Sequence, residues 1–250
     1  MGRLSGKVAL VTGGAVGIGA ACAHWLAAQG IGRLALVDRY AAGLEAIELD
    51  CRCDRFVGDV ADEALWDRFE KQQIPLDFAV LNAGIAGGGL LPQTSLADWR
   101  RLMTVNLDGA FLSLRSALRL IGDGGSIVLT ASIAGLKGEP GAASYAVSKA
   151  AVIQLAKVAA KELAPRGVRV NAIAPAGVDT PIWDNLDFFK GLVAQTGSRE
   201  AAIAAMAKVS SPLGRIATAD EIAGQIGFLL SDAAGLITGT VLVSDGGYSL

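Results

Sequence analysis

The sequence predicts a single doubly wound α/β domain over residues 1–250, in which helices cover both faces of a parallel sheet. Three observations predict this fold. Short apolar runs such as residues 7–11 and 33–38 alternate with longer stretches of helical spacing. The runs are almost continuously Val, Leu, Ile and Ala, which is typical of strands buried on both faces. No linker, repeat or low-complexity segment divides the chain.

Each expected element follows from the same pattern. The expected strands are residues 7–11, 33–38, 54–60, 77–84, 124–132 and 168–175, with a last strand in TGTVLVSDGG near the end of the chain. The expected helices are residues 17–30, 41–49, 96–121 and 144–167, with another from about 219. An insert from 177 to about 211 follows the sixth strand. Because ligands bind beyond the carboxyl ends of the strands in such folds, we expect a small helical lid there.

Composition excludes several classes of protein. With 22 basic and 24 acidic residues and no basic block, the sequence argues against nucleic acid or a membrane surface as a partner. No stretch of about 18 residues is apolar without interruption, so no membrane span is expected. We find no signal peptide, and three cysteines make no disulfide framework, so we expect a cytoplasmic protein. A single histidine, His24, gives no basis for a metal site.

The segment A-S-Y-A-V-S-K-A, residues 143–150, carries the first chemical signal. Tyr145 and Lys149 are four residues apart in an expected helix, so their side chains are neighbours on one face. The ordinary alternative is that Tyr145 is an aromatic residue of a helix face without chemistry.

A glycine-rich turn, T-G-G-A-V-G-I-G, lies between the first strand and the first helix. Glycine permits a sharp turn and close approach of the backbone to a ligand, and the helix N-terminus presents free N–H groups to a pyrophosphate. With a strand before it and a helix after it, the turn predicts a Rossmann-type dinucleotide site. The candidate cofactor-binding residues of this turn are Gly13, Val16, Gly17, Ile18 and Gly19.

Asp38 ends the second strand, about twenty residues beyond the turn, where such folds place a carboxylate on the ribose 2′-OH. A carboxylate there repels a 2′-phosphate, so we expect NAD rather than NADP. Arg39 complicates this expectation, because its positive charge could bind the 2′-phosphate of NADP. The alternative is that Asp38 is a solvated acid at a strand end.

Together these residues resemble the short-chain dehydrogenase/reductase family over almost the whole chain. The motifs are T-G-x-x-x-G-x-G at 12–19, D-V at 59–60, N-A-G at 82–84, Asn106, Ser132, Y-x-x-x-K from Tyr145, P-A-G-V-D-T at 175–180 and S-D-G-G at 244–247.

The resemblance implies a role for each matching residue. It implies that Asp59 hydrogen-bonds the adenine with support from the Val60 backbone. Further cofactor contacts are implied for Asn82, Gly84, Pro175, Gly177, Val178 and Thr180. It implies that Asn106, Ser132, Tyr145 and Lys149 form the catalytic set, in which Asn106 holds a water of the proton relay. It also implies a homotetramer, for which the apolar faces of the helices at 96–121 and 144–163 are suited.

The chemistry expected is hydride transfer between a secondary alcohol and NAD, with Tyr145 as general base and Ser132 binding the same oxygen. A phenol has a pKa near 10 and is a poor base at neutral pH. An ammonium about 4 Å away would favour phenolate by about 4 kcal/mol at an effective dielectric of 20. We therefore expect Lys149 to lower the pKa of Tyr145, with desolvation acting in the opposite direction, and to hold the cofactor ribose.

The substrate side is less determined. The family usually has Pro-Gly where this chain has Pro175-Ala176, so backbone strain is expected at Ala176 unless Gly177 takes the turn. Trp183 and Phe188 are the candidate substrate contacts in the insert, with Ala176, Ser132 and Tyr145; alternatively, the aromatic residues only pack the lid onto the body. We expect Glu139 to face water.

These observations predict an NAD-dependent dehydrogenase acting on a secondary alcohol or ketone. The alternatives are an NADPH-dependent 3-oxoacyl carrier-protein reductase, which Asp38 disfavours, and a cofactor-binding sensor without turnover. A sensor would have no need to keep Tyr145 and Lys149 together.

Overall fold

The computed structural model describes residues 4–250, which build a seven-stranded parallel sheet in the order β3-β2-β1-β4-β5-β6-β9. The chain winds outward from β1 in both directions, so the doubly wound fold is confirmed. The strands are β1 (Val8–Thr12), β2 (Arg33–Asp38), β3 (Arg52–Val57), β4 (Leu76–Leu81), β5 (Ile121–Thr130), β6 (Arg169–Pro175) and β9 (Val241–Ser244).

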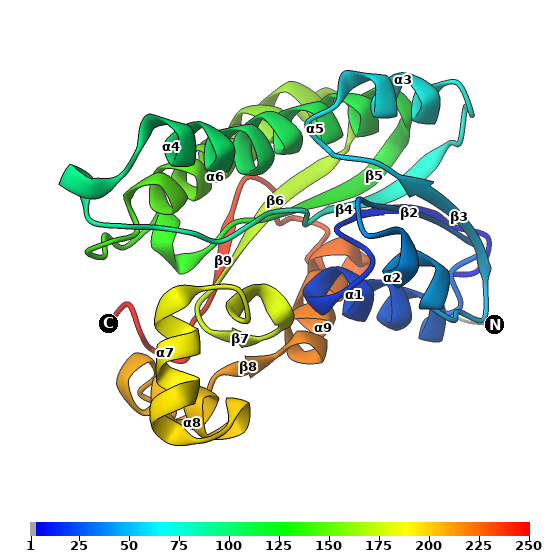
Figure 1. The fold of residues 1–250 in the computed structure, drawn as a ribbon. Helices are drawn as coiled ribbons and strands as arrows, with labels where there is room; N and C mark the ends of the chain where they lie inside the picture. Colours follow the sequence, from blue (N-terminus) through cyan, green and yellow to red (C-terminus); the bar gives the residue numbers. More distant parts are fainter. Residues whose placement is uncertain (1–3) are drawn as a thin grey trace.

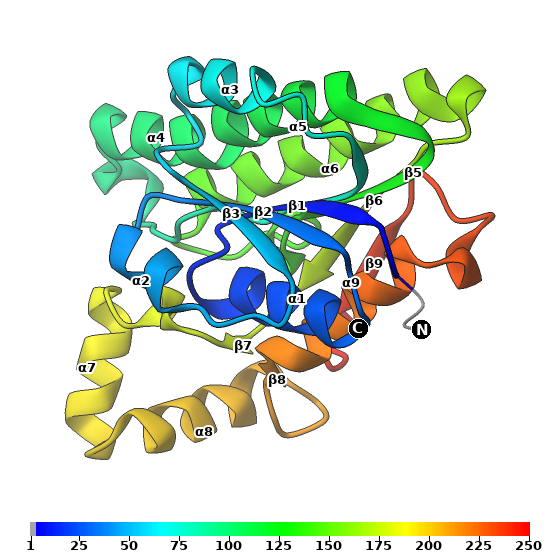
Figure 2. The same cartoon turned by 90° about the vertical axis from the view of Figure 1, so that its right-hand side faces the viewer.

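Helices cover both faces of this sheet (Figures 1 and 2). The helices on one face are α3 (Glu63–Glu70), α4 (Leu96–Met103), α5 (Gly109–Leu120) and α6 (Ala143–Leu163). The helices on the other face are α1 (Gly17–Ala28), α2 (Ala41–Ala46) and α9 (Ala219–Leu230). Because the sheet is covered on both faces, the carboxyl ends of its strands are its functional edge.

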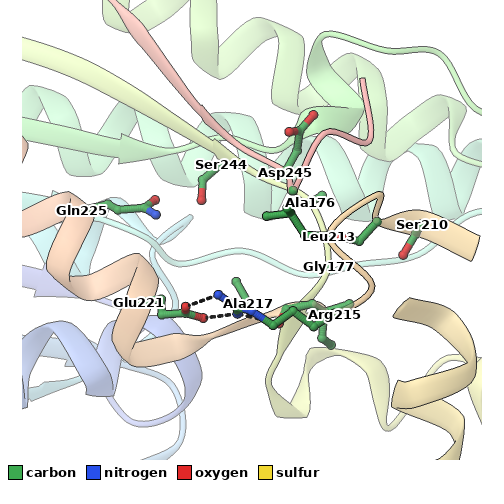
Figure 3. A pocket seen from close by; sticks show the side chains of 13 residues that line it. Ala176, Gly177, Ser210, Leu213, Arg215, Ala217, Glu221, Gln225, Ser244 and Asp245 are labelled. Carbon is green, nitrogen blue, oxygen red and sulfur yellow. Dashed lines mark hydrogen bonds and ion pairs between the residues drawn. The ribbon is translucent and has the colours of Figure 1, made fainter. Parts of the chain in front are cut away.

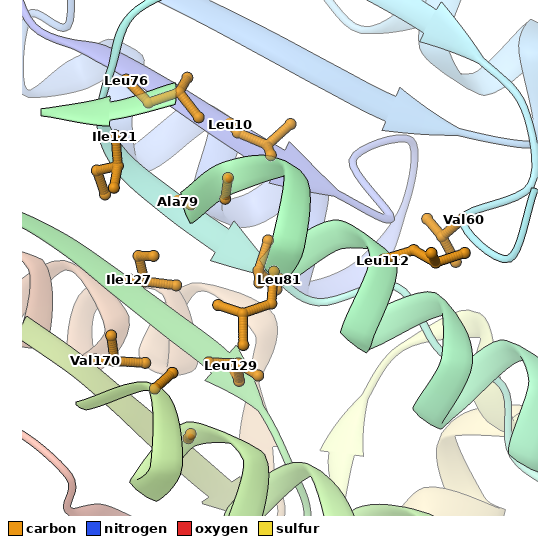
Figure 4. Packing of buried hydrophobic residues seen from close by; sticks show 14 of the residues in the cluster. Leu10, Val60, Leu76, Ala79, Leu81, Leu112, Ile121, Ile127, Leu129 and Val170 are labelled. Atoms are coloured by element: carbon orange, nitrogen blue, oxygen red, sulfur yellow. The ribbon is translucent and has the colours of Figure 1, made fainter. Parts of the chain in front are cut away.

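Alternation along each strand divides the core in two. Leu10 of β1 packs with the residues of α3, α5 and α6, whereas its neighbours Ala9 and Val11 pack with α1 and α9. Figure 4 shows Leu10 beside Ala79 of β4, and Ile127 of β5, which pairs with Ala79, continues the same layer. Period-2 alternation therefore operates in these strands, although both faces of each strand are apolar.

The insert after β6 forms a separate lobe below the sheet edge (Figure 1). Its elements are β7 (Val178–Asp179), α7 (Asp187–Thr196) and α8 (Arg199–Ser210), and β7 pairs with β8 (Ala217–Thr218). The expected helical lid at 177–211 is therefore present as two helices. The pairing of β7 with β8 joins the entry of the insert to its exit.

Three elements differ from the sequence-based expectation. Helix α3 was not expected, although Asp62 caps it by accepting from the Ala64 N–H at 3.0 Å, and three apolar residues, Leu65, Trp66 and Phe69, are buried. Helix α2 is only six residues long. The long helix at 96–121 contains a π-helical turn, Thr104–Asp108, between α4 and α5.

Within residues 4–250 no helix is long and apolar enough to cross a membrane. The same part of the chain holds no group of three or more His, Cys, Asp or Glu side chains suited to a metal ion. The three cysteines are free thiols, and burial raises the pKa of Cys22 to about 12, which keeps that thiol protonated.

Candidate active site

The glycine turn has the conformation and the clearance that a bound dinucleotide needs. Gly13 and Gly17 have positive φ angles of 66° and 58°, a region that other residues rarely adopt. At Gly19 an added Cβ would lie 1.9 Å from the Gly13 carbonyl oxygen, so only glycine lets the helix start close to the turn. The glycine turn is therefore suited to bind a pyrophosphate through its backbone N–H groups.

Helix α1 presents an uncapped N-terminus at this turn. The N-cap is Val16, whose side chain offers no hydrogen bond and is exposed. The first N–H groups of the helix, including that of Ile18, thus have no side-chain acceptor. An anion is favoured here by these free donors and by the positive end of the helix dipole.

Asp38 ties the glycine turn to the end of β2. One carboxylate oxygen accepts from the Ala15 N–H at 3.0 Å, and the other accepts from the Tyr40 N–H at 2.9 Å. Each oxygen retains a further lone pair for a ribose hydroxyl. Asp38 is therefore more than a solvated strand-end acid, and Arg39 beside it is exposed.

The ends of β1 and β4 are joined by the hydroxyl of Thr12, the first residue of the T-G-x-x-x-G-x-G motif, to which the sequence analysis assigned no role. Thr12 is buried, and its Oγ1 accepts from the N–H groups of Asn82 and Ala83 at 3.0 and 3.1 Å. Asn82 Nδ2 in turn donates to the Gly13 carbonyl at 3.4 Å. This network sets the N-A-G segment directly beside the glycine turn.

Asp59 and Val60 follow β3 at the same edge of the sheet. Asp59 is exposed and accepts from the Ala61 N–H at 2.9 Å. Val60 is buried, and its carbonyl accepts from the indole N–H of Trp66 at 2.8 Å. The Asp59 carboxylate is thus accessible, while α3 holds the backbone that follows it.

Asn106 lies in the π-helical turn and its amide is fully engaged with protein. Its Oδ1 accepts from the Ile85 N–H at 2.8 Å, and its Nδ2 donates to the Ile85 carbonyl at 3.0 Å and to Ser148 Oγ at 3.1 Å. Ser148 donates onward to the Tyr145 carbonyl at 2.7 Å. The side chain therefore clamps the segment after Gly84 to the helix that carries Tyr145.

Lys149 is buried beneath Tyr145. Its Nζ donates to the Thr130 carbonyl at the end of β5 at 2.8 Å and lies 5.8 Å from the centre of the Tyr145 ring. An added Cβ on Gly84 would come within 3.3 Å of this Nζ. Burial lowers the pKa of Lys149 to about 8, because desolvation disfavours the ammonium.

Tyr145 lies beside Ser132, the last residue before a short helical turn after β5. Burial raises the pKa of Tyr145, and a hydrogen bond with the Ser132 hydroxyl acts in the opposite direction. The expectation that Lys149 lowers this pKa is therefore wrong for the ligand-free chain. The physical reason is that both groups are desolvated and the ammonium is directed to the Thr130 carbonyl.

The segment after β6 passes close to the glycine turn. An added Cβ on Gly17 would lie 3.3 Å from the side chain of Thr180, so the two segments touch. The Val178 carbonyl accepts from the indole N–H of Trp183 at 2.7 Å. These contacts bring the predicted cofactor residues from both ends of the chain together.

The strain expected at Ala176 is absent. Among residues 4–250 only Gln73 is a non-glycine residue with positive φ. Gly177 has no positive φ either; it is needed because an added Cβ would lie 2.7 Å from Ile216 Cγ2. Ala176 N–H donates to the Ser244 carbonyl at 3.1 Å, which fixes Pro175-Ala176 against the tail.

The aromatic residues of the insert divide by exposure. Phe189 is 2% exposed, whereas Phe188 is 57% exposed, and Trp183 contacts both rings. Packing the insert onto the body thus accounts for Phe189. Phe188 is left with a free face, as a substrate contact requires.

Sequence analysis missed a cluster that involves the end of the chain. Glu139 does not simply face water: it forms an ion pair with Lys137 at 3.2 Å, and burial together with the neighbouring Glu139 carboxylate raises the pKa of Tyr248 to about 12. The Lys137 Nζ lies 3.9 Å from the Tyr248 ring centre and donates to the Tyr248 carbonyl at 3.2 Å. This cluster holds the loop between Ser132 and Tyr145, and no local pattern predicts a contact across 111 residues.

Comparison with known proteins agrees with this geometry. A family model described as Enoyl-(Acyl carrier protein) reductase matches residues 13–249. D-threitol dehydrogenase of Mycolicibacterium smegmatis is 40% identical over 259 aligned residues, which cover 99% of this chain and 95% of that protein. The chain belongs to the short-chain dehydrogenase/reductase family.

Two further members show the range of the family. The NADP-dependent (R)-specific alcohol dehydrogenase of Lentilactobacillus kefiri is 35% identical, with 99% of this chain and 98% of that protein covered. A crystal structure of NAD⁺-bound xylitol dehydrogenase superposes with a TM-score of 0.87 at 31% identity, covering 98% of this chain and all of that one. Members of this family are oxidoreductases that use a nicotinamide cofactor, so the family and the general oxidoreductase class expected from sequence are confirmed.

Proposed function

We propose that this short-chain dehydrogenase/reductase is an NAD-dependent enzyme that interconverts a secondary alcohol and a ketone. One observation carries the proposal: Ser132 and Tyr145 lie together at the sheet edge that also carries the glycine turn, with the buried Lys149 Nζ 5.8 Å from the centre of the Tyr145 ring. A pair of hydroxyl groups beside a dinucleotide turn is suited to hold one oxygen while a hydride leaves its carbon.

Each residue has a distinct part. Ser132 donates a hydrogen bond to the substrate oxygen, and Tyr145 accepts the hydroxyl proton in oxidation and returns it in reduction. Lys149 supplies positive charge beneath the phenol, and Asn106 keeps the helix of Tyr145 in register with the segment after Gly84. When bound, the nicotinamide ring supplies the hydride acceptor.

The choice of NAD is supported by Asp38. Its carboxylate accepts two backbone N–H groups at the end of β2 and retains lone pairs for a ribose diol, whereas a 2′-phosphate there would meet a like charge. Both NAD and NADP are used within the family, since the xylitol dehydrogenase structure contains NAD⁺ and the L. kefiri enzyme is NADP-dependent.

A substitution at Asp38 tests this choice. We expect Asp38→Ala to lower the ratio of kcat/KM with NAD to kcat/KM with NADP at least about tenfold, or about 1.4 kcal/mol. Asp38→Asn is the matched control, because it removes the charge and keeps an amide oxygen for the turn. An unchanged ratio in both variants would show that another group reads the ribose.

The substrate we propose is a small secondary alcohol, with polyols and cyclic alcohols first. The D-threitol and xylitol enzymes among the relatives support polyols, and the free face of Phe188 supports a partly apolar substrate. The deciding experiment is cofactor reduction followed by absorbance, with a panel of polyol, cyclic, aromatic and steroid alcohols, each with NAD⁺ and NADP⁺.

The outcomes of this screen separate the alternatives. Turnover of one alcohol class with NAD⁺ supports the proposal. Turnover only with NADP⁺, together with reduction of 3-oxoacyl thioesters, would favour the carrier-protein reductase, because a 3-oxoacyl-[acyl-carrier-protein] reductase of Thermotoga maritima is 35% identical to this chain. Tight cofactor binding without turnover of any alcohol or ketone would favour the sensor.

We further propose that the chain acts as one domain in a cytoplasmic homotetramer. Exposed apolar side chains on α5 and α6, Phe111, Val147 and Val158, are between 43% and 47% exposed and support burial between subunits. Light scattering after size exclusion tests the assembly, and a monomer at micromolar concentration would contradict it.

A further inference from the structure

The tail of the chain, residues 245–250, follows the last strand, and the S-D-G-G motif forms its bend. The Asp245 carboxylate accepts from the Gly247 N–H at 2.9 Å and from the Ser249 N–H at 2.8 Å. Gly246 and Gly247 have positive φ angles of 62° and 89°, and an added Cβ on Gly246 would collide with the segment that leaves the insert. The motif, to which the proposed reaction gives no part, therefore determines the direction in which the chain leaves β9.

The tail is tied first to the segments before and after the insert. The Ser244 carbonyl accepts from the Ala176 N–H at 3.1 Å, and the Gly246 carbonyl accepts from the Leu213 N–H at 3.2 Å. Figure 3 shows Ser244 and Asp245 near Ala176, at the wall of a cavity of about 130 Å³ that both ends of the insert also line. Two backbone hydrogen bonds therefore fix the start of the tail.

Tyr248 then meets an ammonium in the loop between Ser132 and Tyr145. The Lys137 Nζ lies 3.9 Å from the centre of the Tyr248 ring, where a cation is attracted to the aromatic face, and it donates to the Tyr248 carbonyl at 3.2 Å. The same Nζ forms an ion pair with Glu139 at 3.2 Å. Tyr248 thus supplies a ring and a carbonyl to this ammonium, and Glu139 supplies a carboxylate.

A short run of hydrogen bonds connects Lys137 to Ser132. The Lys137 N–H donates to the Ile133 carbonyl at 2.8 Å, and the Gly135 N–H donates to the Ser132 carbonyl at 2.9 Å. The Ser132 Oγ itself accepts from the Ala134 N–H at 3.2 Å. An added Cβ on Gly135 would lie 2.8 Å from a backbone nitrogen of α6, so the turn lies tightly against that helix. A displacement of Lys137 is therefore passed to the turn that orients the Ser132 hydroxyl.

We propose that Tyr248 is a positioning residue of the reaction. Its ring and carbonyl hold Lys137, and the turn from Ser132 to Lys137 then keeps the Ser132 hydroxyl where it binds the substrate oxygen. The inference rests on the proposed function, which gives Ser132 that part. The S-D-G-G bend has its reason in the same role, because it directs the tail onto Lys137.

Steady-state kinetics of the full chain, with the alcohol that the cofactor-reduction screen identifies, test this role. We expect Tyr248→Ala to lower kcat about tenfold, because misplacing a reacting group by about 1 Å can cost about a hundredfold. The KM for NAD should change less than about twofold, since the substitution acts on Ser132 and not on the glycine turn. Tyr248→Phe keeps the ring and the carbonyl and should restore kcat to within about twofold of wild type.

Substitution of the partner tests whether Tyr248 acts through Lys137. Lys137→Met should reproduce the loss of kcat, and the double variant with Tyr248→Ala should lose no more than Lys137→Met alone, because one contact is removed in both. Lys71→Met is the matched control, since Lys71 is an exposed lysine at the end of α3 and should leave kcat unchanged. Additive losses in the double variant would overturn the proposal.

Hydrogen exchange of the cofactor-free chain separates the failure of this inference from that of the proposed function. Tyr248→Ala should speed exchange of the amides of residues 134–137 about tenfold relative to wild type and Tyr248→Phe, with β1 unchanged. If wild type turns over no alcohol while this pattern is found, the proposed function fails and the hold of the tail on the Ser132 turn stands.

Three results would overturn the role of Tyr248. They are a wild-type kcat in Tyr248→Ala, an equal loss in Tyr248→Phe, and unchanged exchange of residues 134–137 in Tyr248→Ala. Faster exchange in β1 as well would mean that Tyr248→Ala loosens the whole chain, and the same two measurements on Lys137→Met then decide.

Discussion

The platform that carries Tyr145 and the insert after β6 are held in different ways. In the platform, formed by the end of β5, the π-helical turn and α6, the buried polar groups Asn106, Ser148 and Lys149 are all bonded to backbone. In the insert, the ion pairs of Arg199 with Asp179 and Asp184 are partly exposed.

This difference indicates where precision is needed. Buried groups that are hydrogen-bonded to backbone favour one geometry, which hydride and proton transfer require. Exposed ion pairs and one free aromatic face contribute little to rigidity and are easily rearranged. We infer that the platform sets the chemistry and that the insert sets which alcohol enters, so substitutions in the two regions should affect different quantities.

The largest expected effect is on the platform. We expect Tyr145→Phe to lower kcat by about a thousandfold or more, equivalent to about 4 kcal/mol in the barrier, with cofactor affinity nearly unchanged. The reason is that no other hydroxyl with the position of the phenol is present to move the proton. Steady-state kinetics and cofactor titration measure the two quantities, and retention of more than a tenth of the activity would contradict the assigned role.

A matched pair in the insert comes next. Phe189→Ala should lower the free energy of unfolding by about 3 kcal/mol, because a fully buried ring is replaced by a cavity. Phe188→Ala, one residue away and 57% exposed, should leave stability nearly unchanged and raise KM for the alcohol. Urea denaturation with kinetics distinguishes them; equal losses of stability would show that the insert is packed as firmly as the platform.

The buried ammonium gives a third test, by pH. The pKa of Lys149 is lowered from 10.5 to about 8, so between these values the unfolded chain holds more protons and the free energy of unfolding rises with pH. From pH 7 to pH 9.5 we expect wild type to gain about 2 kcal/mol relative to Lys149→Met. Parallel pH profiles for the two proteins would mean that Lys149 is not desolvated.

The smallest effect is expected at the surface of the insert. Arg199→Gln should cost about 0.5–1 kcal/mol of unfolding free energy at low salt, and less at high salt, because its carboxylate partners are exposed to solvent. Denaturation at two ionic strengths measures it. A loss above about 2 kcal/mol, independent of salt, would show that Arg199 belongs to a rigid region and would weaken the comparison.

Sequence predicts those parts of this molecule that local sequence patterns determine. Gly13 and Gly19 are required by backbone geometry within one turn, and Tyr145 and Lys149 are neighbours because a helix places them so. The strand order follows from alternating elements. In each case the cause lies within a few residues or in a topological rule.

The parts that sequence did not predict depend on contacts between distant segments. The pKa of Tyr145 is raised by burial, which the sequence does not give. The hydrogen bond from Lys149 Nζ to the Thr130 carbonyl also gives the ammonium a partner other than Tyr145, so the expected Tyr145–Lys149 pair is incomplete. Ala176 proved unstrained because the turn after β6 uses no positive φ there. Helix α3, by contrast, had a readable signal in Asp62 and the apolar residues that follow.

The contact of Tyr248 with Lys137 and Glu139 has a consequence for biosynthesis. Lys137, in the loop between Ser132 and Tyr145, is translated 111 residues before its partner Tyr248. The Gly246 carbonyl also accepts from the Leu213 N–H of the segment that leaves the insert. Because a chain folds from its N-terminus as it is synthesised, the sheet can form on the ribosome before this loop has its partners. A nascent chain therefore completes these contacts only after residues 246–248 are translated, well after the strands β1 to β6.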